Sequence, residues 1–163
     1  MRTLLFLLTF IFFQTSAQDF KNSSWGDTPE DVLKNEKDLV FLGKESLDRN
    51  LTGLTFVEDG SEGIYYTHTY LFYNEKFYGV RTKRSYLDGD NTFYKALNDY
   101  NQKLESYKES YEKFIKEKAK QEGYEMKAFQ IKLPERTLYV SLKKEEDDFF
   151  IMESTFSNNE GYH

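Results

Sequence analysis

The chain contains no cysteine, only two prolines and only two histidines among its 163 residues. Without cysteine, disulfide bonds, thiolate metal sites and cysteine nucleophiles are excluded, so stability must come from a packed core. The histidines are His68 and the last residue, His163, and the sequence has no Gly-x-Ser-x-Gly motif. A Ser–His–Asp triad would therefore have to use one of these two histidines. The sequence therefore argues against most hydrolase chemistry.

Basic clusters are also missing. The formal net charge is −6, and no patch of lysine and arginine stands out that could collect phosphates. A nucleic-acid partner is therefore not expected, and neither is binding to an anionic membrane surface. We predict no cofactor and no metal site.

Long apolar runs are absent beyond the first residues. Residues 4–13 form an apolar run after Arg2, and a small-residue stretch ends at Ala17, which is the pattern of a secretory signal. The run has about ten residues, whereas a helix that spans a bilayer needs about 20. We predict a signal peptide over 1–17 and one periplasmic or secreted domain over 18–163, with no membrane insertion after cleavage and no lipidated cysteine.

What the chain does have is aromatic residues, 15 Phe and 13 Tyr, which supply large buried areas for a core. No internal repeat, low-complexity tract or Pro/Gly-rich linker is visible, so a single domain is expected.

The stretch "SSWGDTPEDVLKNE" predicts the start of a short helix. Thr28 is suited to the N-cap, Pro29 to the first helical position, and Asp31 to the third position of a capping box. We expect Trp25 to fold back over the apolar face of this helix, with Gly26 allowing the close approach. This interpretation gives the Trp-Gly pair a structural role; a ligand site is the alternative.

Strand-like and helix-like patterns follow in blocks. A stripe of apolar residues spaced 4, 3, 4, 3 predicts a long helix over about 92–121, ended by Gly123. Short runs rich in β-branched and aromatic residues predict strands at 39–42, 51–57, 64–73, 77–86, 126–133, 137–143 and 149–156. This order predicts an α+β fold: an antiparallel sheet of hairpins with both helices packed on one face. The stripe favours a monomer; a homodimer through helix 92–121 is the alternative.

If the helices cover one face of the sheet, alternation exposes a second face rich in tyrosine, threonine and basic residues. Tyrosine and arginine are enriched in recognition surfaces, although such residues also suit a merely solvated strand face. The candidate binding residues are Tyr65, Thr67, Tyr73, Arg81, Lys83 and Tyr139, with Thr69 and Ser141 nearby.

The remaining candidate for chemistry is His68, which alternates in phase with the apolar residues Ile64 and Phe72. This phase predicts a buried or half-buried sheet histidine; a general base or metal ligand is the alternative. Asp88-Gly89-Asp90 has only part of a calcium-loop pattern and suits a helix start. The acidic run 145–148 is typical of a solvated hairpin turn.

The motif Trp25-Gly26-x-Thr28-x-x-x-Val32 resembles the start of uncharacterised exported bacterial proteins. The element order is similar to the small helix-plus-antiparallel-sheet modules of β-lactamase inhibitor proteins and of outer-membrane assembly lipoproteins of the SmpA/OmlA type. This chain departs from them in having no lipidated cysteine and a longer aromatic helix. The expected function is non-catalytic binding of a protein or envelope component; a hydrolase or metal-dependent enzyme centred on His68 and nearby carboxylates is the alternative of a different class.

Overall fold

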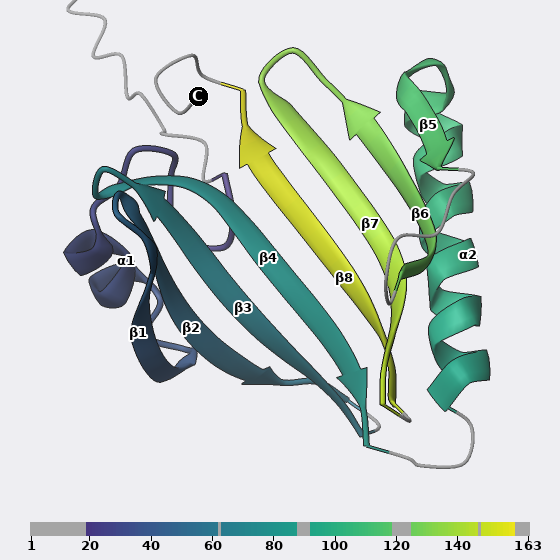
Figure 1. Ribbon diagram of the computed structural model, residues 1–163, viewed down its shortest axis with the longest axis horizontal. Coiled ribbons are helices and arrows are strands. Elements are labelled where there is room, and N and C mark those ends of the chain that lie inside the picture. The colour runs from purple at the N-terminus through teal and green to yellow at the C-terminus, as the bar shows by residue number, and fades with distance from the viewer. Residues whose placement is uncertain (1–18, 62, 88–91, 119–124, 147, 159–163) are drawn as a thin grey trace, which may run out of the picture.

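The computed structural model describes residues 19–61, 63–87, 92–118, 125–146 and 148–158. Within these residues, eight strands form one antiparallel sheet accompanied by two α-helices (Figure 1). The elements are α1 (Pro29–Asn35), β1 (Val40–Asp48), β2 (Leu51–Asp59), β3 (Ile64–Tyr73), β4 (Lys76–Tyr86), α2 (Thr92–Tyr111), the 3₁₀ turn η2 (Glu112–Phe114), β5 (Ile115–Lys118), β6 (Glu125–Lys132), β7 (Arg136–Glu145) and β8 (Asp148–Ser157). The predicted α+β class is confirmed.

Helix α1 begins where the sequence predicts. The Asp31 N–H donates to Thr28 Oγ1 at 3.2 Å, and the Thr28 N–H donates to Asp31 Oδ2 at 3.1 Å, which completes the capping box. The Trp25 ring lies 4.7 Å from the Phe77 ring, centroid to centroid. Gly26 has φ 94°, a conformation that favours glycine, and its N–H donates to the Phe77 carbonyl at 2.8 Å. The Trp-Gly pair thus contacts Phe77 of β4, and Trp25 packs against the same apolar cluster as Val32 of α1.

Helix α2 is shorter than the predicted 92–121. It ends at Tyr111, and after the turn η2 the chain enters β5, an edge strand that the sequence pattern did not predict. Continuing the helix would have carried only one more residue of the apolar stripe, Phe114, which is 48 % exposed. The extended conformation instead pairs Ile115 with Ile131 of β6 and packs Ile115 against the core. Gly123 lies outside the described residues. Neither described helix is long and apolar enough to cross a membrane.

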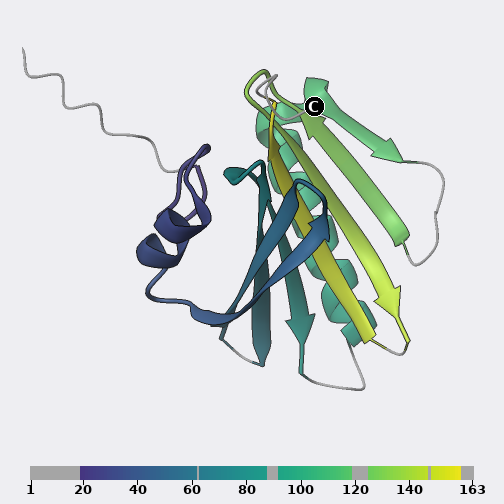
Figure 2. The ribbon, with the colours of Figure 1, turned by 60° about the vertical axis from the view of Figure 1, so that its left-hand side comes forward.

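The strand order is β1-β2-β3-β4-β8-β7-β6-β5. Each half of the chain is therefore a helix followed by four strands, and the two halves join through their last strands, β4 and β8. Figure 2 shows the two halves as one continuous, strongly twisted sheet. This topological repeat has no counterpart in the sequence, where no repeat is visible.

Both helices cover the same face of the sheet. The α1 half buries a cluster that includes Val32 and Val80, and the α2 half buries one that includes Leu104 and Ile151. Residues paired across antiparallel strands share a face. Val80 pairs with Thr155 and Arg84 pairs with Ile151, so the two clusters lie on one face, which we call the covered face. The opposite side of the sheet is the open face.

On the covered face, polar residues separate the two clusters. We call them the polar strip, which consists of Glu58, His68, Thr82, Arg84 and Glu153.

Candidate functional site

The six candidate binding residues all lie on the open face. Tyr65, Thr67 and Tyr73 alternate along β3, and Thr67 pairs with Lys83 of β4. Arg81 pairs with Thr69 on one side and with Ser154 on the other, and Ser154 in turn pairs with Tyr139 of β7. Because paired residues share a face, the register brings side chains from β3, β4 and β7 to one surface.

These residues do not form a single cluster. Tyr65 and Tyr73 are eight positions apart on one strand, which places them about 26 Å apart at 3.3 Å per residue. The open face therefore has two parts. The central zone consists of Thr67, Thr69, Arg81, Lys83 and Tyr139. The aromatic corner consists of Tyr73, Tyr78 and Phe156.

The central zone carries positive charge in an otherwise acidic protein. Lys83 Nζ lies 3.0 Å from Glu145 Oε2 and 4.1 Å from the centroid of the Phe150 ring, so this ammonium is already engaged. Arg81 is exposed, and no described carboxylate lies within ion-pair distance of its guanidinium. Arg81 is thus an exposed cation of the central zone that is available to a partner.

The aromatic corner is a feature that sequence reasoning missed in part. The Tyr73 and Tyr78 rings meet edge to face at 6.5 Å, and the Tyr78 ring stacks on Phe156 at 6.0 Å. A Cβ at Gly79 would lie 2.5 Å from Phe156 Cδ1, so only glycine fits beneath that ring. Burial raises the pKa of the Tyr78 phenol. The available signal was Gly79 within a strand, which indicates a bulge or a close approach.

Between these residues, the open face is closely packed although no described helix lies over it. Leu71 is 2 % exposed and Phe150 is 5 % exposed. Ser141, which the sequence pattern placed near the exposed residues, is fully buried, so that expectation was wrong. Its cross-strand neighbours are Ala128, itself 3 % exposed, and Met152. Buried positions therefore lie among the more exposed side chains of the open face.

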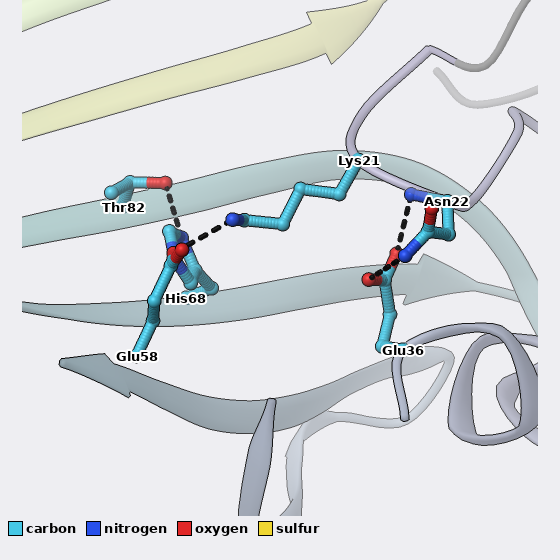
Figure 3. Close-up of polar contacts among 6 residues, drawn as sticks. All are labelled: Lys21, Asn22, Glu36, Glu58, His68 and Thr82. Carbon is cyan, nitrogen blue, oxygen red and sulfur yellow. Dashed lines mark hydrogen bonds and ion pairs between the residues drawn. The ribbon is translucent and has the colours of Figure 1, made fainter. Parts of the chain in front are cut away.

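On the covered face, His68 is buried, as its alternation predicted, with 3 % of its surface exposed (Figure 3). Its Nε2 lies 2.9 Å from Glu58 Oε2, and its Nδ1 lies 2.9 Å from Thr82 Oγ1. A carboxylate only accepts hydrogen bonds, so the neutral ring donates from Nε2 and accepts the Thr82 hydroxyl at Nδ1. Lys21 Nζ also donates to Glu58 Oε2, at 2.7 Å.

The surroundings of His68 determine its ionisation. Burial lowers the pKa of the imidazole, and the hydrogen bond to Glu58 opposes this shift without cancelling it. Burial would raise the pKa of the Glu58 carboxyl, but the hydrogen bonds from Lys21 and His68 outweigh it, and the pKa falls. A neutral histidine beside a charged glutamate is therefore the favoured state.

This geometry bears on the enzyme alternative. Both ring nitrogens of His68 are engaged inside the fold, and the Phe20 and Tyr66 rings lie 5.5 Å and 6.1 Å away. In the part of the chain that the structure describes, no three His, Asp or Glu side chains are grouped to hold a metal. The calcium-like Asp88-Gly89-Asp90 stretch lies outside the described residues. Both nitrogens of His68 are thus hydrogen-bonded inside the fold, and only 3 % of its surface is exposed.

A second buried polar group, Glu36, follows α1 (Figure 3). Glu36 is 2 % exposed, and its carboxylate accepts hydrogen bonds from the Asn22 N–H at 3.1 Å and the Ser23 hydroxyl at 2.7 Å. Burial, followed by the neighbouring Glu36 carboxylate, raises the pKa of the Tyr70 phenol. Glu36 therefore fastens the N-terminal segment to the end of α1, which is a structural role.

The comparisons with known proteins provide no assignment: no protein-family model, no curated protein and no solved structure matches this chain. The functional argument therefore rests on the geometry of the open face.

Proposed function

We propose that this chain is an exported, non-catalytic binding protein that recognises a protein or envelope component through its open face. The observation that carries the proposal is the asymmetry of the sheet. Both helices lie on the covered face, while the open face presents an arginine without an ion-pair partner among the described residues, flanked by threonines and tyrosines.

The chemistry of the open face indicates what a partner would offer. Arg81 suits a carboxylate, because a guanidinium forms two parallel hydrogen bonds with it. Tyrosine and phenylalanine rings at the aromatic corner provide large contact area with few rotatable bonds. We therefore expect the partner to present an acidic group next to an apolar or aromatic patch. Strands of one sheet hold these groups at fixed spacing, which reduces the entropy lost on binding.

Affinity capture with matched variants tests this proposal. The chain from residue 18 onward would serve as bait in an envelope extract of the source cells. We expect Arg81→Ser and Tyr73→Ala each to weaken capture of the same partner by at least about tenfold, the scale of a charged hydrogen bond or a buried aromatic anchor.

Two residues outside the open face provide the controls. Arg49 lies in the exposed β1–β2 turn, and Tyr94 lies on α2 with 70 % of its surface exposed. Arg49→Ser and Tyr94→Ala remove the same chemical groups and should leave capture unchanged. Equal loss in the control variants, or retained capture in both open-face variants, would show that the open face is not the binding surface.

Export is tested separately. Cell fractionation and N-terminal sequencing should find the protein outside the cytoplasm with Gln18 as its first residue. A cytoplasmic protein that retains residues 1–17 would contradict the predicted signal peptide while leaving the binding test intact.

A further inference from the structure

A pocket of about 200 Å³ lies on the covered face, between the last turns of α2 and the N-terminal segment. Arg136 and Leu138 of β7 form part of its wall, Tyr107 and Tyr111 of α2 lie across it, and Asp19 closes it from the N-terminal side. It is on the opposite side of the sheet from Arg81, so an inference about it is independent of the open face.

The backbone register explains how these groups meet. Arg136 is the first residue of β7 and lies two positions before the buried Leu138, so both side chains point to the covered face. Leu138 pairs with Thr155 of β8 and with Ile131 of β6. The result is a cationic group beside an apolar floor.

The guanidinium of Arg136 has no ion-pair partner among the described residues. Its Nε is buried without a hydrogen-bond partner, and no described carboxylate lies within 4.0 Å of its nitrogens. Arg84, on the same face, instead pairs with Asp99 at 2.9 Å. Arg136 is half-buried, and a buried polar atom without a hydrogen-bond partner costs free energy and calls for an explanation such as a ligand.

The two acidic groups of the wall, Glu153 and Asp19, are described residues and form no ion pair with Arg136. Glu153 forms an ion pair with Lys103 and accepts a hydrogen bond from the Tyr107 hydroxyl at 3.3 Å. Burial and the Glu153 carboxylate raise the pKa of the Tyr107 phenol, which keeps that hydroxyl protonated as a donor. Asp19 Oδ2 accepts the Trp25 N–H at 2.8 Å. Arg136 is left as the group that needs an anionic partner.

We infer that this pocket binds the carboxylate of a small organic acid with an apolar body. Arg136 would hold the carboxylate through two parallel hydrogen bonds, and the hydroxyls of Tyr111 and Thr155 would be additional donors. The apolar body would lie against Leu138 and its neighbours. A volume of about 200 Å³ is below the usual range for drug-sized ligands, so the molecule is about the size of an amino acid.

The carboxylate could belong to an aliphatic acid or to a free amino acid, and the position of Asp19 in the pocket wall distinguishes the two. An aliphatic acid would use only Arg136 and the apolar floor. A free amino acid has an ammonium group as well, which Asp19 could attract from the opposite wall. Both share the carboxylate that Arg136 recognises.

Calorimetric titration of the chain from residue 18 onward with hexanoate, leucine and 1-hexanol tests the inference. We expect saturable binding of hexanoate or leucine, no binding of 1-hexanol, and at least about tenfold weaker binding of the carboxylate by Arg136→Gln. Tighter binding of leucine than of hexanoate would assign Asp19 a role. Lys132→Gln removes an exposed positive charge from the neighbouring strand and should bind like the unmodified protein.

The fold of the variant is checked independently. Because Arg136 has no ion-pair partner among the described residues, Arg136→Gln should unfold at a temperature no lower than the unmodified protein in the absence of ligand. If it fails to fold, Arg136→Lys keeps the charge but not the two-pronged geometry, and it should bind several-fold more weakly. Absence of saturable binding by both carboxylates, binding of 1-hexanol equal to that of hexanoate, or undiminished binding by the Arg136 variant would overturn the inference.

Discussion

The two halves of the molecule are covered by helices of different length. In the half formed by α1 and β1–β4, a helix of seven residues covers an aromatic cluster. In the half formed by α2 and β5–β8, a helix of 20 residues covers a largely aliphatic cluster. The two halves share a chain order and a face. They differ in what attaches the helix to the sheet. Helix α2 buries Ala96, Tyr100 and Leu104 along its own length. Helix α1 buries only Pro29 and Val32.

The short helix is too small to hold its place through apolar area alone. The N-terminal segment adds polar attachments: Glu36 accepts from Asn22 and Ser23, and the Gly26 N–H donates to Phe77 of β4. Lys21 reaches Glu58 at the edge of the polar strip. The comparison teaches that one face of one sheet can be covered by two means, apolar burial in one half and a polar network in the other.

The polar strip separates the two covers. Arg84 and the Tyr86 hydroxyl both bind Asp99 of α2, and Lys103 binds Glu153. The β4–β8 ladder is continuous beneath these contacts, and Tyr86 of β4 and Ile64 of β3 pack into the apolar cluster of the α2 half. The halves are therefore joined through backbone hydrogen bonds, polar side chains and the edge of that cluster.

The largest expected effect is loss of core volume in the α2 half. Phe129 is fully buried, and its ring lies 5.6 Å from Tyr100 and 5.9 Å from Tyr107. Phe129→Ala should reduce the free energy of unfolding by about 3–5 kcal/mol, because it removes a ring and leaves a cavity. Urea unfolding followed by circular dichroism measures this.

The matched control is Phe114→Ala, which removes the same group from the turn η2, where it is 48 % exposed. The expected change is below about 1 kcal/mol. Equal losses in the two variants would mean that the α2 half does not rely on the packing of its aromatic and aliphatic core.

The second effect should be local to the α1 half. Glu36→Gln weakens hydrogen bonds that a buried carboxylate accepts and should cost about 1–3 kcal/mol. Trp25, the one tryptophan of the chain, lies in this half, so its fluorescence reports the local change while circular dichroism reports the whole sheet. We expect the fluorescence transition to move to lower urea before the circular dichroism transition.

Glu109→Gln, at an exposed position of α2, should shift neither signal. If the two transitions of Glu36→Gln stay superimposed, the halves unfold as one cooperative unit, and the distinction between their covers has no thermodynamic consequence.

A smaller change is expected at the start of α1. Thr28→Ala removes the hydroxyl that caps the Asp31 N–H and should cost about 1 kcal/mol. Thr28→Ser keeps the hydroxyl and should retain most of the stability. Hydrogen exchange of the α1 amides measures both variants, and similar exchange in the two would show that the capping box is not stabilising.

Thr28 also illustrates what the sequence could predict. A capping box is a local pattern, and alternation along β3 is local too, so the helix start, the buried His68 and the shared face of Tyr65 and Tyr73 were all predictable. The end of α2 was not, because the charged stretch that forms β5 is extended through its pairing with β6, a contact between distant segments.

The sites that sequence reasoning missed depend on register. Arg136 and Thr155 come to one pocket because Leu138 pairs with Thr155, and no spacing along the chain reveals that pairing. Glu58 reaches His68 in the same way, through the pairing of β2 with β3. Side chains that act together across strands become visible only when the strand order is known.

The last prediction concerns the polar strip that divides the halves. The pKa of His68 is lowered by burial, so the unfolded chain binds a proton at a higher pH than the folded one. Stability from the neutral ring is therefore complete above the ordinary value of 6.5 and is lost as pH falls from there through the lower folded pKa. Between pH 8 and pH 5, the free energy of unfolding should decline less steeply in His68→Gln than in the unmodified protein. Parallel profiles for the two proteins would mean that protonation of His68 does not weaken the contact between the sheet and its N-terminal cover.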